Sequence, residues 1–333
     1  MLTKSFWPTL AYTMILLLMP VSERAARAIE LDPNLPAYQP VEGISGTIKS
    51  VGSDTMNNLM ALWTEDFRRM YPAVLPEIEG KGSSTAPAAL IEGTASFGPM
   101  SRPMKDAEID RFEERFGWKP TELRVGIDML AIYVNKDNPV AERGLSLAEA
   151  DAIFSSTRKY GHDDISTWGE IGLRGDWENA TINVYGRNSV SGTYGFFKQV
   201  VMGDGDFKSS VNEQPGSAGV VQGVAGERYA IGYSGIGYRT PDVATVPLAV
   251  EEDGELIPAE EEYALTGEYP LTRFLLVAVN VEPNKPLDPL RREFIRYIYS
   301  QQGQEVVLKN GYLPVTAVIA RRQLGAANIE PGF

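Results

Sequence analysis

The amino-acid sequence predicts an α/β protein whose parallel strands are joined by crossover helices. Three stretches support this prediction, because in each a strand-like run leads through a short turn rich in Gly, Ser or Thr into a helix-like run. The strands are expected at residues 47–51, 73–79 and 180–185, and the helices at residues 57–70, 86–92 and 194–202. Repetition of this pattern indicates βαβ units and parallel sheets. A chain of 333 residues can hold two domains or one large α/β body.

The remaining elements follow from apolar periodicity and capping residues. The expected helix at 57–70 has an apolar stripe formed by Leu59, Leu62, Trp63, Phe67 and Met70. Ser146 and Glu149 form a capping box that begins a helix at 146–154. Strands are also expected at 94–97, 125–135 and 274–280, and one helix at 289–304.

The amino-terminal segment predicts export. Lys4 precedes an apolar run, and Ala26-Arg-Ala28 offers a small-x-small cleavage site, so residues 1–28 are interpreted as a signal peptide cleaved near Ala28. The alternative is a membrane anchor, but the run is shorter than the roughly 20 residues of a spanning helix. Residues 29–45 are rich in proline and are interpreted as an extended leader.

Charge argues against nucleic acid as a partner. The formal net charge is −13, and it becomes −15 without residues 1–28, which hold three basic residues and one acidic residue. Such a surface repels nucleic acid and acidic membranes, since phosphate backbones are bound mainly by Lys and Arg. If the protein binds a small anion, the attraction has to come from local donors.

Four polar turns suggest such local donors. They lie at residues 52–56, 82–85, 98–102 and 187–193. Backbone N–H groups at the start of a helix, together with the positive end of the helix dipole, suit an anion. The alternative for each turn is an ordinary Ser, Thr or Asp helix cap.

Catalytic and metal-binding residue types are scarce. The sequence has no Cys, and its one His, His162, lies between Gly161 and two aspartates. A thiolate site, a zinc site built on Cys and a multi-His metal site are therefore excluded. We expect no metal, no cofactor and no catalytic residues.

The sequence resembles the phosphate-binding periplasmic proteins that serve ABC-type phosphate importers. The resemblance covers residues 46–323 and rests on the order and spacing of seven short motifs. They are Gly-Ser-Asp-Thr at 52–55, Gly-Ser-Ser at 82–84, Phe-Gly-Pro-Met-Ser-Arg at 97–102, Arg-Asn-Ser-Val-Ser-Gly-Thr at 187–193, Ala-Ile-Gly-Tyr at 230–233, Tyr-Pro-Leu-Thr-Arg at 269–273 and Gly-Tyr-Leu-Pro at 311–314.

The resemblance implies a two-lobed, type II-like periplasmic-binding-protein fold. Each lobe is a mixed, mostly parallel sheet flanked by helices, and the ligand lies in the cleft between lobes. Lobe one is expected to comprise residues 46–125 and 270–333, and lobe two residues 126–269. The implied protein is a monomer in the periplasm that captures inorganic phosphate by lobe closure and delivers it to an ABC permease, without stable membrane insertion and without enzymatic activity.

The family's phosphate ligands map onto two groups of residues. The implied ligands are Ser53, Asp54, Thr55, Ser83, Ser101 and Arg102 in lobe one, and Arg187, Ser191, Gly192 and Thr193 in lobe two. Two positions depart from the family pattern. Ser101 stands where many members carry the aspartate that accepts the phosphate proton, and Ser189 stands where an acidic partner of the arginine is common.

Asp54 is the hypothetical replacement for that aspartate. A buried carboxylate accepts a hydrogen bond from the protonated oxygen of hydrogen phosphate. Sulfate carries no proton, so its oxygen and the carboxylate are both acceptors and no hydrogen bond forms between them. Arg102 or Arg187 would keep Asp54 ionised. The alternative role for Asp54 is a helix N-cap. Alternative functions are a receptor for phosphonate, sulfate or molybdate and a secreted phosphatase, although no phosphate-loop or Gly-x-Ser-x-Gly motif is present.

Overall fold

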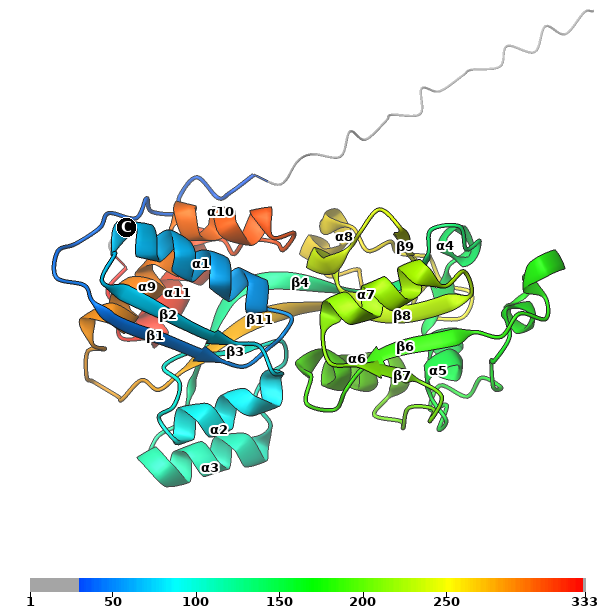
Figure 1. The fold of residues 1–333 in the computed structure, drawn as a ribbon, viewed down its shortest axis with the longest axis horizontal. Coiled ribbons are helices and arrows are strands. Elements are labelled where there is room, and N and C mark those ends of the chain that lie inside the picture. The colour runs from blue at the N-terminus through cyan, green and yellow to red at the C-terminus, as the bar shows by residue number, and fades with distance from the viewer. Residues whose placement is uncertain (1–29, 332–333) are drawn as a thin grey trace, which may run out of the picture. The chain divides into compact units, whose positions relative to one another are not determined.

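The computed structural model describes residues 30–331 and alternates strands with helices along most of that length (Figure 1). The predicted signal peptide, residues 1–28, lies outside the described residues. In chain order the elements are β1 (Gly46–Val51), α1 (Asn57–Met70), β2 (Val74–Glu79), η1 (Ser83–Thr85), α2 (Ala86–Ile91), β3 (Gly98–Met100), α3 (Asp106–Phe116), β4 (Thr121–Asn135), α4 (Val140–Arg143), β5 (Leu145–Ser146), α5 (Leu147–Phe154), η2 (Trp168–Ile171), η3 (Gly175–Trp177), β6 (Asn183–Arg187), α6 (Gly192–Met202), β7 (Asn212–Gln214), α7 (Ser217–Gly226), β8 (Ala230–Gly235), η4 (Ile236–Tyr238), β9 (Val243–Thr245), β10 (Leu248–Ala249), α8 (Glu261–Thr266), β11 (Thr272–Val279), α9 (Pro289–Ile298), α10 (Gln301–Lys309) and α11 (Ala317–Ala326).

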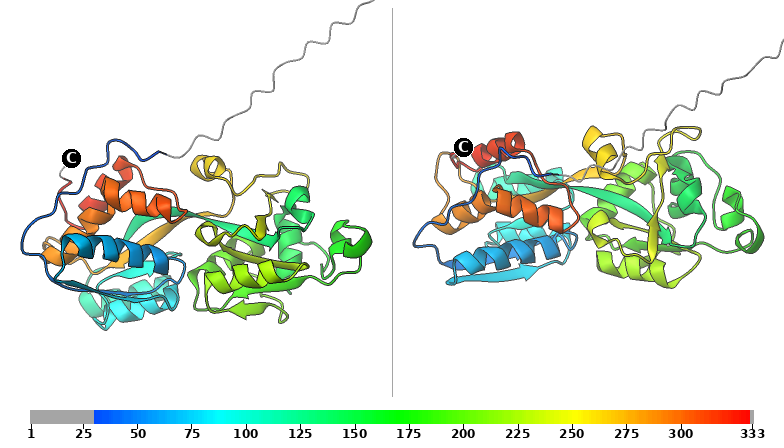
Figure 2. Two further views of the ribbon diagram at one scale, coloured as in Figure 1. Left: turned by 45° about the horizontal axis from the view of Figure 1, so that its top comes forward. Right: turned by 90° about the horizontal axis from the view of Figure 1, so that it is seen from above.

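Two groups of elements form two lobes. Lobe one contains β1–β3, α1–α3 and α9–α11, and lobe two contains the elements from α4 to α8 (Figure 1). The strands β4 and β11 run from one group to the other, which both views of Figure 2 also show. The strand β4 has 15 residues and is paired with β11 along the whole of β11.

The sheets are mixed, and the antiparallel ladders are those that involve the two strands between the lobes, β4 and β11. The parallel ladders are β1–β2, β5–β10, β6–β7 and β6–β8, and most of these strands follow one another through a helix. Every antiparallel ladder between the described strands involves β4 or β11, because these two carry the chain between lobes in opposite directions. Those two strands join the ladders of both lobes into one seven-stranded sheet with the order β3-β11-β4-β8-β6-β7, and β9 pairs with β4.

Two of the three predicted strand–turn–helix stretches, β1–α1–β2 and β6–α6–β7, form parallel βαβ units. The helix α1 spans the predicted residues, and Leu59, Trp63 and Phe67 are fully buried, whereas Leu62 of the predicted stripe is 41% exposed. At the start of α5, the Glu149 N–H donates to Ser146 Oγ over 3.1 Å, and the Ser146 N–H donates to the Glu149 carboxylate over 3.0 Å. The predicted capping box is therefore present.

Two element predictions are wrong in position. The strand expected at 94–97 lies instead at Gly98–Met100, because these residues pair with β11. The helix expected at 289–304 is two helices, α9 and α10. The chain breaks at Ser300, whose Oγ accepts the Gly303 N–H over 3.1 Å and so caps a new helix.

One core holds the two ends of the described chain together. The same buried cluster contains Ile48 and Phe67 from the first elements and Phe294 and Leu324 from the last helices. The proline-rich segment before β1 has no regular element, yet its side chains Leu35, Tyr38 and Ile44 are buried in this cluster. The Tyr38 and Tyr71 hydroxyl oxygens lie 2.7 Å apart, and the Tyr38 N–H donates to Gln302 over 2.8 Å.

Candidate functional site

The turn between β1 and α1 places its polar residues against β3. A Cβ atom on Gly52 would lie 2.2 Å from the Pro99 carbonyl oxygen, so the approach of the two segments requires glycine. The Ser53 N–H donates to that same carbonyl over 2.7 Å. Ser53 and Thr55 are each 1% exposed. The turn is therefore held rigidly, with its hydroxyls directed into the protein.

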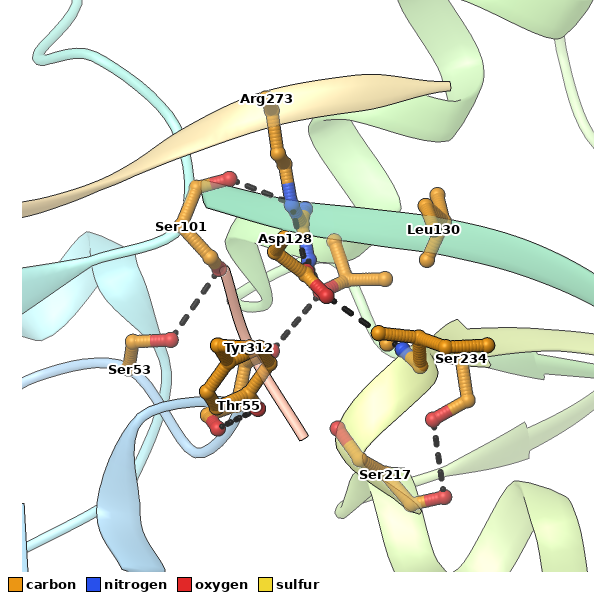
Figure 3. A network of polar contacts seen from close by, with 12 residues as sticks. Ser53, Thr55, Ser101, Asp128, Leu130, Ser217, Ser234, Arg273 and Tyr312 are labelled. Carbon is orange, nitrogen blue, oxygen red and sulfur yellow. Dashed lines mark hydrogen bonds and ion pairs between the residues drawn. The ribbon is translucent and has the colours of Figure 1, made fainter. Parts of the chain in front are cut away.

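Three serine hydroxyls from separate segments of lobe one meet beside this turn. Ser53 Oγ donates to Ser101 Oγ over 3.1 Å, and Ser83 Oγ lies 3.3 Å from Ser101 Oγ (Figure 3 shows the first of these contacts). Ser83 Oγ also accepts the Ser101 N–H over 3.0 Å. We call Ser53, Ser83 and Ser101 the serine cluster.

The start of α6 in lobe two lies directly against the serine cluster. A Cβ atom added to Gly192 would lie 2.3 Å from Ser83 Oγ and 2.7 Å from Ser101 Oγ. Close by, the Ser84 N–H of lobe one donates to the Val190 carbonyl of lobe two over 3.1 Å. Position 192 therefore requires glycine for the lobes to meet in this way.

Two hydroxyls of the α6 turn have distinct partners. Ser191 Oγ accepts the N–H groups of Thr193 and Tyr194 over 3.1 and 3.4 Å, so Ser191 is the N-cap of α6. Thr193 Oγ1 lies 2.9 Å from Thr55 Oγ1 of lobe one. The helix cap and the interlobe contact thus come from residues two positions apart.

Arg187 and Asp54 form an ion pair between the lobes. Arg187 Nη1 lies 3.3 Å from Asp54 Oδ2, and it also donates to Ser217 Oγ over 2.6 Å. The Arg187 side chain is 1% exposed, and its Nε is among the buried polar atoms without a hydrogen-bond partner in the described part of the chain. Burial lowers the pKa of the Arg187 guanidinium, and the Asp54 charge opposes that effect. The group stays protonated, as arginine does in proteins.

Asp54 does not cap its own helix. The cap of α1 makes no side-chain hydrogen bond, and Asp54 Oδ2 instead accepts the Ser217 N–H over 2.8 Å at the start of α7 in lobe two. Tyr238 OH donates to the Asp54 carbonyl oxygen over 2.9 Å. Burial, followed by the Asp54 charge, raises the pKa of Tyr238, so this phenol remains a neutral donor. The helix-cap alternative for Asp54 is therefore wrong.

Arg102 has partners that differ from those of the other predicted residues. Its guanidinium pairs in bidentate fashion with the Glu108 carboxylate over 2.8 and 2.7 Å, and it donates to Ser84 Oγ over 3.1 Å. Arginine and carboxylate fit each other in this forked geometry. Of the two arginines expected beside Asp54, the structure places Arg187 there and pairs Arg102 with Glu108 on α3.

The structure brings nine of the ten predicted site residues to one region where the lobes meet. They are Ser53, Asp54, Thr55, Ser83, Ser101, Arg187, Ser191, Gly192 and Thr193. Arg102 lies beside this region, where its guanidinium donates a hydrogen bond to Ser84 Oγ.

Several residues of this region were not predicted from sequence. The buried pair Asp128–Arg273 joins β4 to β11, with 2.7 Å between Arg273 Nη2 and Asp128 Oδ2 (Figure 3). The sequence offered one signal for this pair, because Asp128 is a lone acidic residue within the apolar run 125–135 and a buried charge needs a partner. Ser217 follows a strand and opens a helix, which is the same pattern as the other turns. Tyr312 OH donates to the Thr55 carbonyl over 2.8 Å.

Taken together, the site offers many neutral donors and two arginines, Arg187 and Arg273, each paired with an aspartate. The hydroxyls come from both lobes, and Arg187 supplies a forked positive charge. The amino-terminal ends of α6 and α7 also lie at the region, where the Thr193 N–H donates to Ser191 Oγ and the Ser217 N–H donates to Asp54. Between residues 30 and 331 the structure contains no cluster of acidic residues and His that would hold a metal ion. Over the same residues, no helix has both the length and the apolar character to cross a membrane.

Comparison with known proteins gives the family. The model of the PBP superfamily domain matches residues 38–302. The chain is 52% identical over 301 residues to the phosphate-binding protein PstS of Pseudomonas aeruginosa strain PAO1, an alignment that covers 90% of this chain and 93% of that one. This protein belongs to the PstS family of the PBP superfamily.

Other similar proteins are more distant. PstS of Staphylococcus haemolyticus is 26% identical over 263 residues, which is 78% of this chain and 79% of that one. The crystal structure of a phosphate ABC transporter substrate-binding protein from Clostridium perfringens, with bound phosphate, is 27% identical and superposes with a TM-score of 0.68 over 81% of this chain and all of that one. An ABC-type phosphate transport receptor from Vibrio cholerae has a TM-score of 0.61 at 20% identity, over 80% of this chain and all of that one, which shows the shared fold. The predicted two-lobed fold and the predicted family are both confirmed.

Proposed function

We propose that this PstS-family protein is an extracytoplasmic receptor that captures inorganic phosphate between its lobes and delivers it to an ABC permease. The proposal is supported by 52% identity to a phosphate-binding PstS over 90% of the chain. It is also supported by the phosphate-bound relative from Clostridium perfringens.

One observation carries the proposal: donors from both lobes converge. Thr55 of lobe one and Thr193 of lobe two touch through their hydroxyls, and the serine cluster lies against Gly192. Short side chains with this arrangement surround a small ligand only when the lobes close over it. A tetrahedral oxyanion accepts several hydrogen bonds at once, so it matches a site with many donors.

The attraction for an anion has to come from short-range contacts within the site. The whole chain carries a formal charge of −13, which repels an anion at long range. Inside the closed site, the buried Arg187 and the N–H groups at the starts of α6 and α7 oppose that repulsion. The unpartnered Nε of Arg187 is one further donor for an anion oxygen.

Asp54 is the proposed source of selectivity. Its carboxylate is held beside Arg187 and against the amino-terminal end of α7. Hydrogen phosphate donates a hydrogen bond to this carboxylate through its own proton, whereas sulfate and molybdate have no proton with which to donate one. The Asp54 side chain is 22% exposed in the structure, and a bound anion would cover it. Leaving a covered, charged acceptor facing another acceptor costs upwards of about 1–3 kcal/mol, so these anions bind more weakly.

The lobe division is proposed as residues 46–125 with 270–333, and 126–269, with β4 and β11 as the hinge strands. We further propose that residues 1–28 are removed as a signal peptide near Ala28, and that the released protein is a periplasmic monomer. It binds without catalysing a reaction, as its relatives are binding proteins of transporters.

The test is a calorimetric titration of the purified protein, freed of phosphate, with a panel of oxyanions. The expected result is one phosphate site with a dissociation constant of about 1 µM or tighter. Sulfate and molybdate at a thousandfold excess should not compete. Competition by either would show that the selectivity proposal is wrong, and tighter binding of a phosphonate would assign a different ligand.

A parallel assay separates binding from catalysis. The same preparation is incubated with p-nitrophenyl phosphate and the release of nitrophenolate is followed. Saturable phosphate binding with no release supports a receptor. Release that persists through purification and is lost in the Arg187→Lys variant would support a phosphatase instead.

A further inference from the structure

Asp128 and Arg273 form a cross-strand pair on the two strands that pass between the lobes. They stand directly opposite each other in the β4–β11 ladder. Arg273 Nε and Nη2 donate to the same carboxylate oxygen, Asp128 Oδ2, over 3.0 and 2.7 Å. The two side chains are 0% and 4% exposed, and Asp128 Oδ1 accepts the Ile236 N–H over 3.3 Å. The orientation of the guanidinium is therefore fixed from one side.

The other side of that guanidinium touches both lobes. Arg273 Nη1 donates to the Ser101 carbonyl of lobe one over 2.9 Å, which is one of the contacts drawn in Figure 3. Arg273 Nη2 donates to Thr193 Oγ1 of lobe two over 2.9 Å. The guanidinium also lies 5.2 Å from the centre of the Phe196 ring on α6. A single buried side chain thus links the serine-cluster segment to the start of α6.

This contact determines what the Thr193 hydroxyl does. A guanidinium has donors only, so Thr193 Oγ1 is the acceptor in its bond with Arg273. A hydroxyl has a single proton, and that proton is then directed away from Arg273, toward Thr55 or toward a bound anion. Arg273 uses Nε, Nη1 and Nη2 in hydrogen bonds within the protein, whereas the Nε of Arg187 has no such partner. Arg273 is therefore a group that arranges donors, which distinguishes it from Arg187.

We propose that Arg273 is a positioning residue for phosphate capture: held by Asp128, it fixes the Thr193 hydroxyl as a donor toward the ligand and holds the Ser101 and Thr193 segments together in the closed form. The inference rests on the proposed function. Closure of the lobes brings the partners of Arg273 together, and opening separates Thr193 and Phe196 from Arg273. The contacts of Arg273 therefore stabilise the closed form and not the open form. The main effect of losing it is therefore faster release of phosphate.

The test uses Arg273→Lys as the main variant. Lysine keeps a positive charge beside Asp128, so the buried carboxylate is not left unpaired. Its single ammonium group lacks the fork that reaches Asp128, Ser101 and Thr193 at the same time. A second variant, Asp128→Asn with Arg273→Gln, removes both charges together and tests the same bridge in a neutral background.

Stopped-flow fluorescence measures association and dissociation of phosphate separately, and thermal unfolding without phosphate monitors the fold. We expect both variants to weaken phosphate binding by roughly 10-fold to 100-fold, mainly through the dissociation rate. The control is Arg143→Lys, which alters another forked arginine–carboxylate pair, with Glu149, on α4 and α5 of lobe two. It should bind phosphate as the wild type does.

A double-mutant cycle gives a readout that a purely structural role would not affect. The Thr193→Val substitution removes the acceptor of the Arg273 bond, so Arg273→Lys should cost much less affinity in that background than in the wild type. Additive effects, or unchanged dissociation in Arg273→Lys, would overturn the inference. Failure of the wild type to bind phosphate would overturn the proposed function instead, and the two results are distinguishable.

Discussion

The hydroxyl oxygens of Thr55 and Thr193 lie 2.9 Å apart, although 138 positions separate the two residues in the sequence. Thr55 precedes α1 in lobe one, and Thr193 lies in the first turn of α6 in lobe two. Contact between two such short side chains requires the lobes themselves to meet at this point. Substitutions on either side of the contact therefore test lobe closure separately from lobe folding.

Replacing Gly192 with alanine should prevent full closure. The added Cβ would lie 2.3 Å from Ser83 Oγ and 2.7 Å from Ser101 Oγ, which is overpacking that costs typically about 1–3 kcal/mol. Because the clash exists only when the lobes meet, we expect phosphate binding to weaken roughly 10-fold to 100-fold. The temperature of unfolding without phosphate should change little.

The matched control for this substitution is Gly325→Ala in α11. A Cβ at Gly325 meets nothing within 4 Å, so the change should slightly raise the unfolding temperature and leave phosphate titrations unchanged. Wild-type affinity in Gly192→Ala would contradict the close approach of α6 to the serine cluster.

Replacing Asp54 with asparagine should reduce selectivity more than total anion binding. The Asp54 carboxylate can only accept hydrogen bonds, whereas the amide of asparagine can also donate one. The amide can therefore donate to a sulfate oxygen, so the free-energy penalty for binding sulfate falls. The preference for phosphate over sulfate should narrow by roughly one to two orders of magnitude. Competition calorimetry measures this ratio. The control is Asp66→Asn, which changes a half-buried acidic residue of α1 that pairs with Arg69 and accepts the Tyr297 hydroxyl, and it should keep the wild-type ratio.

Replacing Arg187 with lysine should weaken phosphate binding by roughly 10-fold to 100-fold, because hydrogen bonds to charged groups are worth about 1.5–3 kcal/mol. Lysine keeps the charge near Asp54 but lacks the fork that reaches Ser217 and Pro215 together. Titration calorimetry measures the change. An affinity within twofold of wild type would show that Arg187 serves the fold alone.

Stability should fall on acidification through the Arg102–Glu108 pair. Burial opposes ionisation of Glu108, but hydrogen bonding and charge from Arg102 hold the pKa of Glu108 below its usual value. A carboxyl with a lowered folded-state pKa contributes stability above the unfolded pKa, roughly 4.3, and loses it as pH falls through the folded value. Glu108→Gln should therefore destabilise the protein at pH 7 and lose less stability than the wild type between pH 5 and pH 3. Urea unfolding at a series of pH values checks this, and parallel curves for the two proteins would contradict it.

Local patterns in the sequence predicted much of the fold and most of the candidate site. The stripe on α1, the capping box at Ser146 and the strand–turn–helix order each depend on residues close together in the chain. The convergence of Asp54 with Arg187 followed from family motifs. These features needed no knowledge of long-range packing.

The features that the sequence analysis did not predict include one pair of distant residues and two short-range contacts. Arg273 and Asp128 are 145 residues apart and meet only because β11 pairs with β4 in one particular register. Arg102 differs from Arg187 because Glu108 on α3, which is close to Arg102 in the sequence, pairs with it. The break in the predicted helix at Ser300 is also local, because Ser300 accepts the Gly303 N–H and caps α10.

The core shared by the two ends of the chain has a consequence for the order of folding. Ile48 and Phe67 pack with Phe294 and Leu324, so the first βαβ unit lacks its apolar partners until the last helices have been made or exported. Residues 140–266, in contrast, form α4 to α8 from one continuous stretch. A polypeptide that emerges amino terminus first therefore keeps its earliest apolar face exposed the longest, which is when aggregation or proteolysis can reach it.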